Sequence, residues 1–210
     1  MFIIFINDLV DLCSDIIKMH LFADDAKLYC HVKNHGNMED LQTGIKKFVE
    51  WTDKWQMKLN IEKCKVISFH HRRYSNNGVI PNYTINSKLL EEVTEIKDLA
   101  VYYDPLLLFD KHICEKVKKA YMMLGIIKRN FIHISRNCFV TLYKSLVRSH
   151  LEYANSVWYP KRKSDIDKLE RVQKRATKLI PELSKISYTD INQQLLLQLF
   201  AGPACSAESR

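Results

Sequence analysis

The spacing of apolar residues along the chain changes at about residue 105. Before that point, short segments with an apolar residue at every second position alternate with longer segments at helical spacing. After it, every patterned segment has helical spacing. The pattern therefore predicts an α+β chain, with strands and helices in residues 1–105 and helices alone in residues 106–200. Residues 201–210 have no apolar period and are predicted to be disordered.

The front part is predicted to open with a helix at residues 2–13. Residues 17–31 alternate around Asp24 and Asp25, which predicts two strands joined by a tight turn. A second helix is predicted from Asn37, acting as N-cap, to about residue 60, and its apolar stripe includes Trp55 as a core residue. Further strands are predicted at residues 65–69, 83–85, 88–90 and 99–103, with Asn86 and Ser87 as a hairpin turn.

The rear part contains apolar stripes for several helices. The first starts near Asp110, and the second has Ser135 as its N-cap. A third begins at Ser164, which forms a sequence similar to a capping box with Asp167, and a last helix is predicted at residues 187–200. The stripe residues expected in the core are Ile113, Val117, Ala120, Leu124, Ile127, Phe139, Leu142, Tyr143, Leu146, Val147, Ile166, Leu169, Val172 and Ala176.

The chain carries 32 Lys and Arg against 24 Asp and Glu, a formal net charge of +8. A surplus of this size favours polyanions, and nucleic acid is the natural partner. The alternative is a protein that merely has a high pI. The basic residues expected to bind nucleic acid lie on two helices: Lys116, Lys119, Lys128 and Arg129 on one, and Arg171, Lys174, Arg175 and Lys178 on the other. For the second set, a solvated face paired with Asp165, Asp167 and Glu170 is the competing interpretation.

The cysteines and the hydropathy of the chain exclude several classes of protein. No two of the six cysteines have a zinc-finger spacing, and reduced thiols are expected. No window approaches the ~20 apolar residues that a membrane-spanning helix needs. We therefore expect an intracellular protein, in the nucleus or the cytoplasm, that is not secreted and has no membrane partner.

Asp24 and Asp25 are the residues with the clearest chemical potential. Adjacent carboxylates repel each other, and a divalent cation would offset that repulsion. Mg²⁺ is bound by one or two protein carboxylates together with phosphates and water, and two such ions can activate an attacking hydroxyl and stabilise a leaving pyrophosphate. Taken alone, however, two aspartates in a turn are more often a solvated turn.

The neighbouring sequence favours the catalytic interpretation. Phe22-Ala-Asp-Asp-Ala-Lys-Leu-Tyr29 resembles the catalytic hairpin of reverse transcriptases of the non-LTR retrotransposon type, and jockey-like elements in particular. Other segments resemble further parts of that family in its order and spacing, over residues 2–200. They are residues 5–9, 55–64, 99–104 with His112, 119–126, 146–154, 156–160 and 169–178.

The resemblance implies an RNA-directed DNA polymerase. It implies a partial palm at residues 1–105, with antiparallel strands and helices, and a helical, thumb-like region at residues 106–200. Asp24 and Asp25 are then the catalytic metal ligands, for Mg²⁺ or Mn²⁺, and Phe22, Ala23, Lys63 and His112 support the motifs. We expect His112 to pack or to form hydrogen bonds rather than to catalyse. The implied partners are an RNA template and a DNA primer, or an RNA–DNA duplex.

The sequence also departs from the family. A third metal-binding Asp, the fingers and a Gly-rich segment precede the hairpin in the family and are not found in these 210 residues. We therefore expect no polymerase activity from this chain alone, and we expect the catalytic Mg²⁺ or Mn²⁺ only together with that further Asp. Ala100 stands where the family usually has Gly, and Asp110 where a small polar residue is usual. The alternative functions are a non-catalytic basic module that binds nucleic acid and a scaffold that binds other partners.

Overall fold

The computed structural model describes residues 6, 9, 16–70, 82–131 and 134–180. The chain divides into two compact units, residues 1–94 and 95–210, and each is described by itself. The boundary expected near residue 105 falls inside the second unit. Of the predicted helix at residues 2–13 only Ile6 and Leu9 are described. The predicted helix at residues 187–200 and the tail lie outside the described residues.

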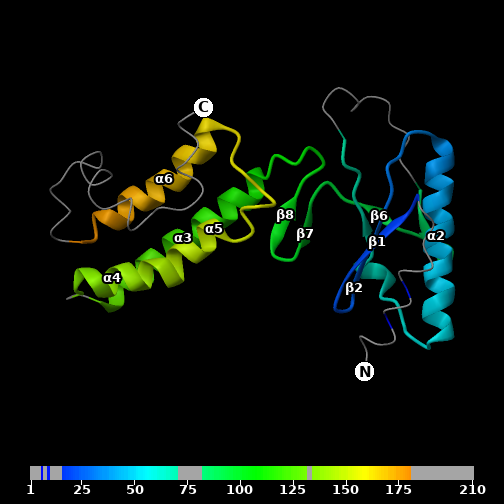
Figure 1. The fold of residues 1–210 in the computed structure, drawn as a ribbon, viewed down its shortest axis with the longest axis horizontal. Coiled ribbons are helices and arrows are strands. Elements are labelled where there is room, and N and C mark those ends of the chain that lie inside the picture. The colour runs from blue at the N-terminus through cyan, green and yellow to red at the C-terminus, as the bar shows by residue number, and fades with distance from the viewer. Residues whose placement is uncertain (1–5, 7–8, 10–15, 71–81, 132–133, 181–210) are drawn as a thin grey trace. The chain divides into compact units, whose positions relative to one another are not determined.

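The predicted hairpin is present in the first unit. Strand β1 (Lys18–Phe22) pairs antiparallel with β2 (Asp25–Tyr29), and Ala23 and Asp24 form the turn (Figure 1). Ala23 adopts a left-handed conformation, with φ of 52°. The hairpin prediction is confirmed.

Helix α2 (His35–Lys54) begins and ends earlier than predicted. Its N-cap is Asn34, whose side chain accepts a hydrogen bond from the Asn37 N–H, so Asn37 already lies in the first turn. Gln56 adopts a left-handed conformation, and the N–H groups of Gln56 and Met57 donate to the carbonyls of Asp53 and Thr52. These two bonds form a Schellman motif, which ends the helix without the glycine that normally signals it.

The remaining strands of this unit are short. Strand β3 (Lys65–Val66) follows a 3₁₀ turn, η2 (Ile61–Lys63), and pairs parallel with β6 (Glu91–Glu92). Strands β4 (Thr84–Ile85) and β5 (Lys88–Leu89) form a hairpin. Its turn residues, Asn86 and Ser87, have φ of 48° and 63°, the signs of a type I′ turn, so the second predicted hairpin is confirmed.

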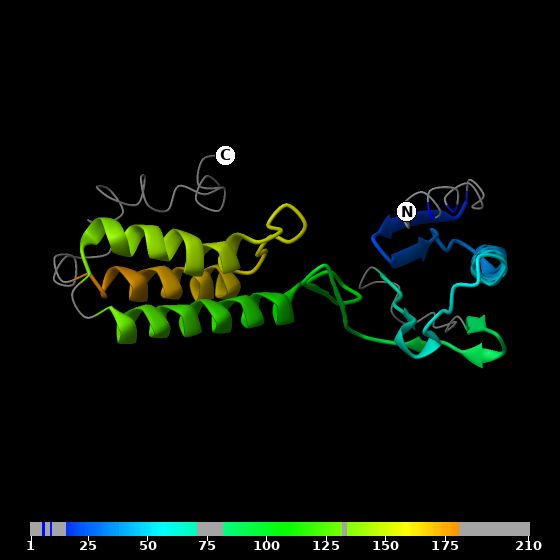
Figure 2. The same ribbon diagram turned by 90° about the horizontal axis from the view of Figure 1, so that it is seen from below.

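Two apolar clusters hold the first unit together on either side of α2. In one cluster, Ile45 and Val49 pack with Tyr83 and Ile85. In the other, Trp51 packs with Leu9 and with Met19 of β1. Figure 2 shows α2 end-on between the β1–β2 hairpin and the β4–β5 hairpin. Trp51 is buried while Trp55 is 37% exposed, so the prediction of Trp55 as a core residue is wrong. The early end of α2 at Lys54 places Trp55 outside the helix.

The second unit opens with a hairpin of β7 (Ile96–Asp98) and β8 (Val101–Tyr103). Leu99 and Ala100 are its turn, with φ of 42° and 63°, so the predicted strand at 99–103 is two residues too long. Ala100 is therefore a non-glycine residue in a left-handed conformation. A glycine adopts positive φ without the steric penalty of a Cβ.

An Asp-centred loop connects β8 to the first long helix. The Asp104 carboxylate accepts hydrogen bonds from the backbone N–H groups of Leu106, Leu108 and Phe109, and Phe109 is left-handed. Helix α3 (Asp110–Asn130) starts immediately afterwards. Asp110 accepts two hydrogen bonds from the Arg162 guanidinium at 2.9 and 2.7 Å. That ion pair ties the start of α3 to the segment before the last helix.

The described residues that follow α3 are mainly helical. A continuous helical run comprises α4 (Arg136–Leu142), the π-helical turn η4 (Tyr143–Arg148) and α5 (Ser149–Glu152), and α6 (Lys163–Thr177) follows. Figures 1 and 2 show α3, this run and α6 side by side. Ser135 is the N-cap of α4, as expected. The shared core is Ala120, Leu124, Ile127, Phe139, Tyr143, Val147, Leu151, Val172, Ala176 and Ile180.

Three details of the helical prediction are wrong. Ser164 does not cap α6, which begins at Lys163 with Arg162 in the N-cap position and no side-chain cap. Ile166 and Leu146 are 36% and 37% exposed rather than core. Leu146 lies in the π-helical turn, whose wider spacing shifts the stripe.

The described residues form a mixture of helices and small, mostly antiparallel sheets, which is compatible with the predicted α+β class. No helix among them has the length and apolar character to cross a membrane.

Candidate catalytic hairpin and nucleic-acid interface

The structure places Asp24 and Asp25 at the bend of the β1–β2 hairpin. Asp24 lies in the turn, and Asp25 is the first residue of β2, opposite Phe22. Met19, Leu21 and Leu28 of the hairpin pack with Trp51 of α2. The two aspartates are exposed, as is Phe22 at 59%. The hairpin therefore presents both carboxylates to solvent from a base that is fixed by apolar packing.

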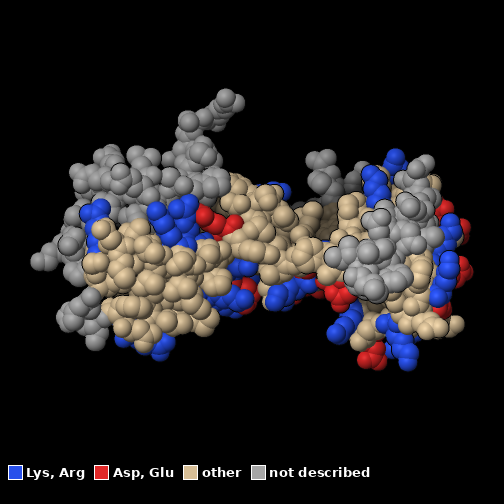
Figure 3. All heavy atoms as spheres, turned by 60° about the horizontal axis from the view of Figure 1, so that its bottom comes forward, with Lys and Arg blue, Asp and Glu red and all other residues tan. Residues whose placement is uncertain are grey.

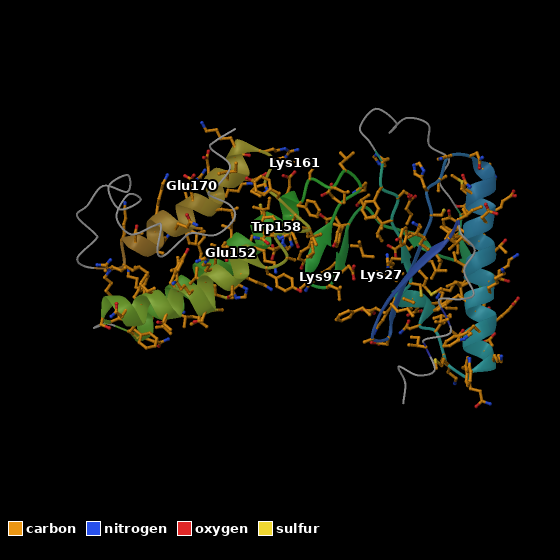
Figure 4. All side chains as sticks on the ribbon, viewed as in Figure 1. Lys27, Lys97, Glu152, Trp158, Lys161 and Glu170 are labelled. Carbon is orange, nitrogen blue, oxygen red and sulfur yellow. The ribbon has the colours of Figure 1, made fainter. Side chains whose placement is uncertain are left out.

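The outer face of the hairpin carries a second feature, which the sequence analysis missed. By strand register, the pairs Lys18–Tyr29, His20–Lys27 and Phe22–Asp25 share this face. His20 Nε2 and the Tyr29 hydroxyl are hydrogen-bonded at 2.7 Å, and the two rings are stacked with centroids 5.2 Å apart. Lys27, labelled in Figure 4, lies on the same face. The alternation of polar residues in β1 was the available signal for this face.

The acidic pair fits part of a divalent-cation site. Neither carboxylate forms an ion pair with any described residue. By contrast, another pair of consecutive carboxylates, Glu91 and Glu92, has partners. Lys65 forms an ion pair with Glu91, and the Ser68 hydroxyl donates a hydrogen bond to Glu92. No three His, Cys, Asp or Glu side chains come together as a metal cluster within the described ranges. Two carboxylates can bind Mg²⁺ only together with water, phosphate or further ligands.

Two of the motif-supporting residues have structural roles. Lys63 ends η2, and its backbone N–H donates to the Asn60 side chain. His112 is fully buried in α3 and its Nδ1 accepts a hydrogen bond of 3.3 Å from the Tyr102 N–H. The ring packs edge-on against Trp158 at 4.9 Å. Figure 4 shows Trp158 between α3 and the β7–β8 hairpin.

Burial sets the protonation state of His112. Desolvation, assisted by the positive charge of Lys116, lowers the pKa of His112 from 6.5 to about 4. The imidazole is therefore neutral at pH 7. Because Nδ1 accepts, the proton resides on Nε2, which has no hydrogen-bond partner among the described residues.

The basic residues predicted on α3 separate into two groups. Lys116 is 7% exposed, and its ammonium lies 4.4 Å from the centre of the Tyr153 ring. Burial, with the charges of Lys119 and Lys97, lowers its pKa. A buried ammonium that is covered by an aromatic ring is not on an open phosphate-binding face, so the structure gives Lys116 no support as a nucleic-acid contact. Lys119, Lys128 and Arg129 are exposed and form no ion pair with a described residue.

The basic face of α6 is only partly neutralised. Lys168 pairs with Asp165, and Lys174 pairs with Glu170. Arg171, Arg175 and Lys178 are exposed at spacings of four and three residues, and within the described part of the chain no carboxylate pairs with them. On the face of the helical unit in Figure 3, Lys and Arg gather in small groups around a wide uncharged area. The competing interpretation, that the basic residues of this helix are all paired with carboxylates, therefore holds for only some of them.

A small pocket brings the two predicted basic sets together. Its lining comes from α3 and from α6 with the turn that follows it, and it has a volume of about 110 Å³. Lys128 belongs to the first basic set and Arg175 to the second, and both line the pocket. The guanidinium of Arg175 lies over the Tyr121 ring at 5.5 Å. Spacing along the sequence could not show that Lys128 and Arg175 line one pocket, because that depends on how the helices pack.

Several known proteins share sequence with the chain. It is 28% identical over 165 residues, 76% of its length, to the RNA-directed DNA polymerase from mobile element jockey of Drosophila melanogaster. It is 28% identical over 185 residues, 83% of its length, to the jockey polymerase of Drosophila funebris. A probable RNA-directed DNA polymerase from transposon X-element of Drosophila melanogaster is 25% identical over 76% of the chain.

The resemblance to reverse transcriptases of jockey-like elements is confirmed. The aligned part of the chain spans only 17%, 19% and 18% of the lengths of these three relatives. No family model matches the chain, and no solved structure matches it. The relationship therefore rests on sequence, while the assignment of palm and thumb rests on the resemblance of individual segments.

Proposed function

We propose that this chain is the part of a mobile-element RNA-directed DNA polymerase that carries the catalytic hairpin and a nucleic-acid-binding helical unit. The observation that carries the proposal is the position of Asp24 and Asp25. They stand exposed and without ion pairs among the described residues, at the bend of a hairpin whose other face packs on α2. The similarity to jockey polymerases over three quarters of the chain supports the same reading.

In this proposal the two carboxylates hold Mg²⁺, for which Mn²⁺ can substitute. The metal ion would supply charge stabilisation for the phosphates and would lower the pKa of an attacking hydroxyl. The hairpin fixes the carboxylates at the tip, and the packing of Met19 and Leu28 prevents the strands from slipping in register.

We further propose that the chain alone does not synthesise DNA. The described residues offer two carboxylates on one hairpin and no third acidic, His or Cys ligand beside them. Two ions in line with a transferring phosphoryl group need more protein ligands than this pair provides.

The test is primer extension on an RNA template with an annealed DNA primer, in Mg²⁺ and in Mn²⁺. The full chain is expected to give no more product than the Asp24→Asn, Asp25→Asn double variant. Metal-dependent extension that the double variant abolishes would confirm the polymerase assignment and refute the predicted inactivity. Extension that the double variant retains would refute the role of the two aspartates.

A non-catalytic basic module that binds nucleic acid is the second candidate. The observation that favours it is the set of exposed basic residues on α3 and α6 without carboxylate partners in the described ranges. Both candidates predict salt-sensitive binding of an RNA–DNA duplex. Only the polymerase candidate predicts that Asp24 and Asp25 bind a divalent cation, so metal binding at the hairpin decides between them.

A further inference from the structure

The pocket between α3 and the end of α6 combines the groups that recognise an unpaired nucleotide. Tyr121, Gly125 and Lys128 line it from α3, and Arg175 and Leu179 line it from the α6 side. The Arg175 guanidinium lies over the Tyr121 ring at 5.5 Å and so forms a planar, cationic wall. Nucleobases stack on aromatic rings and on guanidinium planes, and they tolerate apolar floors such as Leu124 and Leu179.

The charge around the pocket fits a phosphate as well as a base. Lys128 lines the pocket, and within the described residues no carboxylate pairs with it or with Arg175. Arg171 is exposed on the same helix as Arg175, four residues before it, and Lys178 is exposed at the C-cap of that helix, three residues after it. A nucleotide in the pocket would therefore have cationic groups available for its own phosphate and for those of its neighbours.

The pocket is too small to enclose a whole base. Its volume is about 110 Å³, whereas an apolar cavity that binds benzene has about 150 Å³. A base therefore enters it only in part.

We propose that the pocket binds one unpaired nucleotide of a single strand, with the base against the Arg175 guanidinium and the phosphate near Lys128. The inference deepens the proposed function, since it rests on nucleic acid being the partner of the helical unit. It differs from duplex binding along the backbone, because a base that is paired in a duplex cannot enter the pocket.

Gly125 makes the inference testable without removing any charge. A Cβ on Gly125 would have no atom within 4 Å, and the residue lies within α3. A larger side chain there would extend into the pocket instead of straining the fold. Replacing a helical glycine also favours the helix by about 1 kcal/mol on the propensity scale, so Gly125→Leu is expected to be at least as stable as the original chain.

The experiment measures the affinity of the full chain for fluorescein-labelled oligouridylate by anisotropy. Gly125→Leu is expected to weaken binding about tenfold, as loss of one stacked base does, while Gly125→Ala stays within about twofold. Arg175→Lys, which keeps the charge and loses the planar group, is expected to weaken binding to a similar extent. Inorganic polyphosphate, which has charge but no base, should bind Gly125→Leu and Gly125→Ala equally.

Three outcomes would overturn the proposal. The first is equal oligouridylate affinity for Gly125→Leu and Gly125→Ala. The second is equal loss of polyphosphate and oligouridylate binding in Gly125→Leu. The third is a lower urea midpoint of Gly125→Leu in the absence of RNA, which would mean that another part of this chain fills the pocket. If one of these outcomes occurs but the chain still binds a duplex in a salt-sensitive way, the proposed function stands and only the pocket proposal is refuted. If the chain binds neither duplex nor oligouridylate, nucleic-acid binding itself is refuted.

Discussion

The turn between β7 and β8 offers a sharp test of how the backbone determines stability. Ala100 is exposed and has φ of 63°, so its methyl group gains little from burial and is sterically crowded against its own backbone. For an L-residue the left-handed conformation costs about 1–2 kcal/mol. Glycine avoids that penalty but loses about 0.5–1 kcal/mol more in backbone entropy on folding. The difference predicts that Ala100→Gly stabilises the second unit by about 0.5–1 kcal/mol.

The assay is urea unfolding of the full chain, followed by far-ultraviolet circular dichroism. Ala154→Gly is a parallel test, because Ala154 also has a positive φ, of 56°. Ala176→Gly is the opposite control: it deletes the same methyl group, but from a buried position in α6, and should destabilise by about 1–2 kcal/mol. If Ala100→Gly destabilised the chain, the turn would not have the left-handed geometry described above.

Three further predictions follow from the helices. Gln56→Gly should stabilise the first unit by about 0.5 kcal/mol in the same urea assay, because Gln56 occupies the left-handed position of the Schellman motif, and a loss of stability would contradict that geometry. The pKa of His112 is lowered to about 4, so between pH 6.5 and 4 the unfolded chain binds the additional proton and the free energy of unfolding falls as the pH falls. This loss of stability is at most about 3 kcal/mol. It should be absent in His112→Asn, which keeps an acceptor for the Tyr102 N–H but does not titrate. An unchanged pH dependence in that variant would show that another group causes the loss. Finally, Arg171→Gln with Lys178→Gln should lower the slope of log duplex affinity against log salt concentration by about 0.9 for each lost phosphate contact. The control is Lys118→Gln, which should change the slope little because Lys118 is paired with Glu115. Equal slopes in all variants would exclude α6 from the interface.

Much of the fold could be predicted from local pattern. The Asp24 hairpin, the Asn86 turn, the Ser135 cap and the stripe of α3 all follow from rules that act over a few residues. The errors occur at residues whose backbone conformation is unusual for their amino-acid type. Gln56 and Ala100 occupy left-handed positions that usually need glycine, and no composition rule identifies them in advance. The shift of Leu146 out of the core depends on a π-helical turn, which leaves no clear sequence signal.

The candidate site was predictable only in part. Asp24 and Asp25 were identified because the sequence around them resembles the catalytic hairpin of the family. The structure adds that both are exposed and that apolar packing against Trp51 holds the hairpin in place. The sequence did not reveal that Lys116 is buried under Tyr153, since lysines on a helix are usually exposed. Lys128 and Arg175 line one pocket because α3 packs against α6, and no local sequence pattern predicts that packing.

The central claim is that Asp24 and Asp25 are ligands for a divalent cation, and paramagnetic line broadening by Mn²⁺ in amide NMR spectra of the full chain tests it most directly. The account predicts that sub-stoichiometric Mn²⁺ selectively broadens the resonances of residues 22–27 and that Asp24→Asn with Asp25→Asn abolishes the effect. Glu91→Gln with Glu92→Gln is the matched control, because those adjacent carboxylates are already engaged by Lys65 and Ser68, and it should leave the broadening unchanged. Broadening that is centred elsewhere, or that persists in the double Asn variant, would contradict the claim.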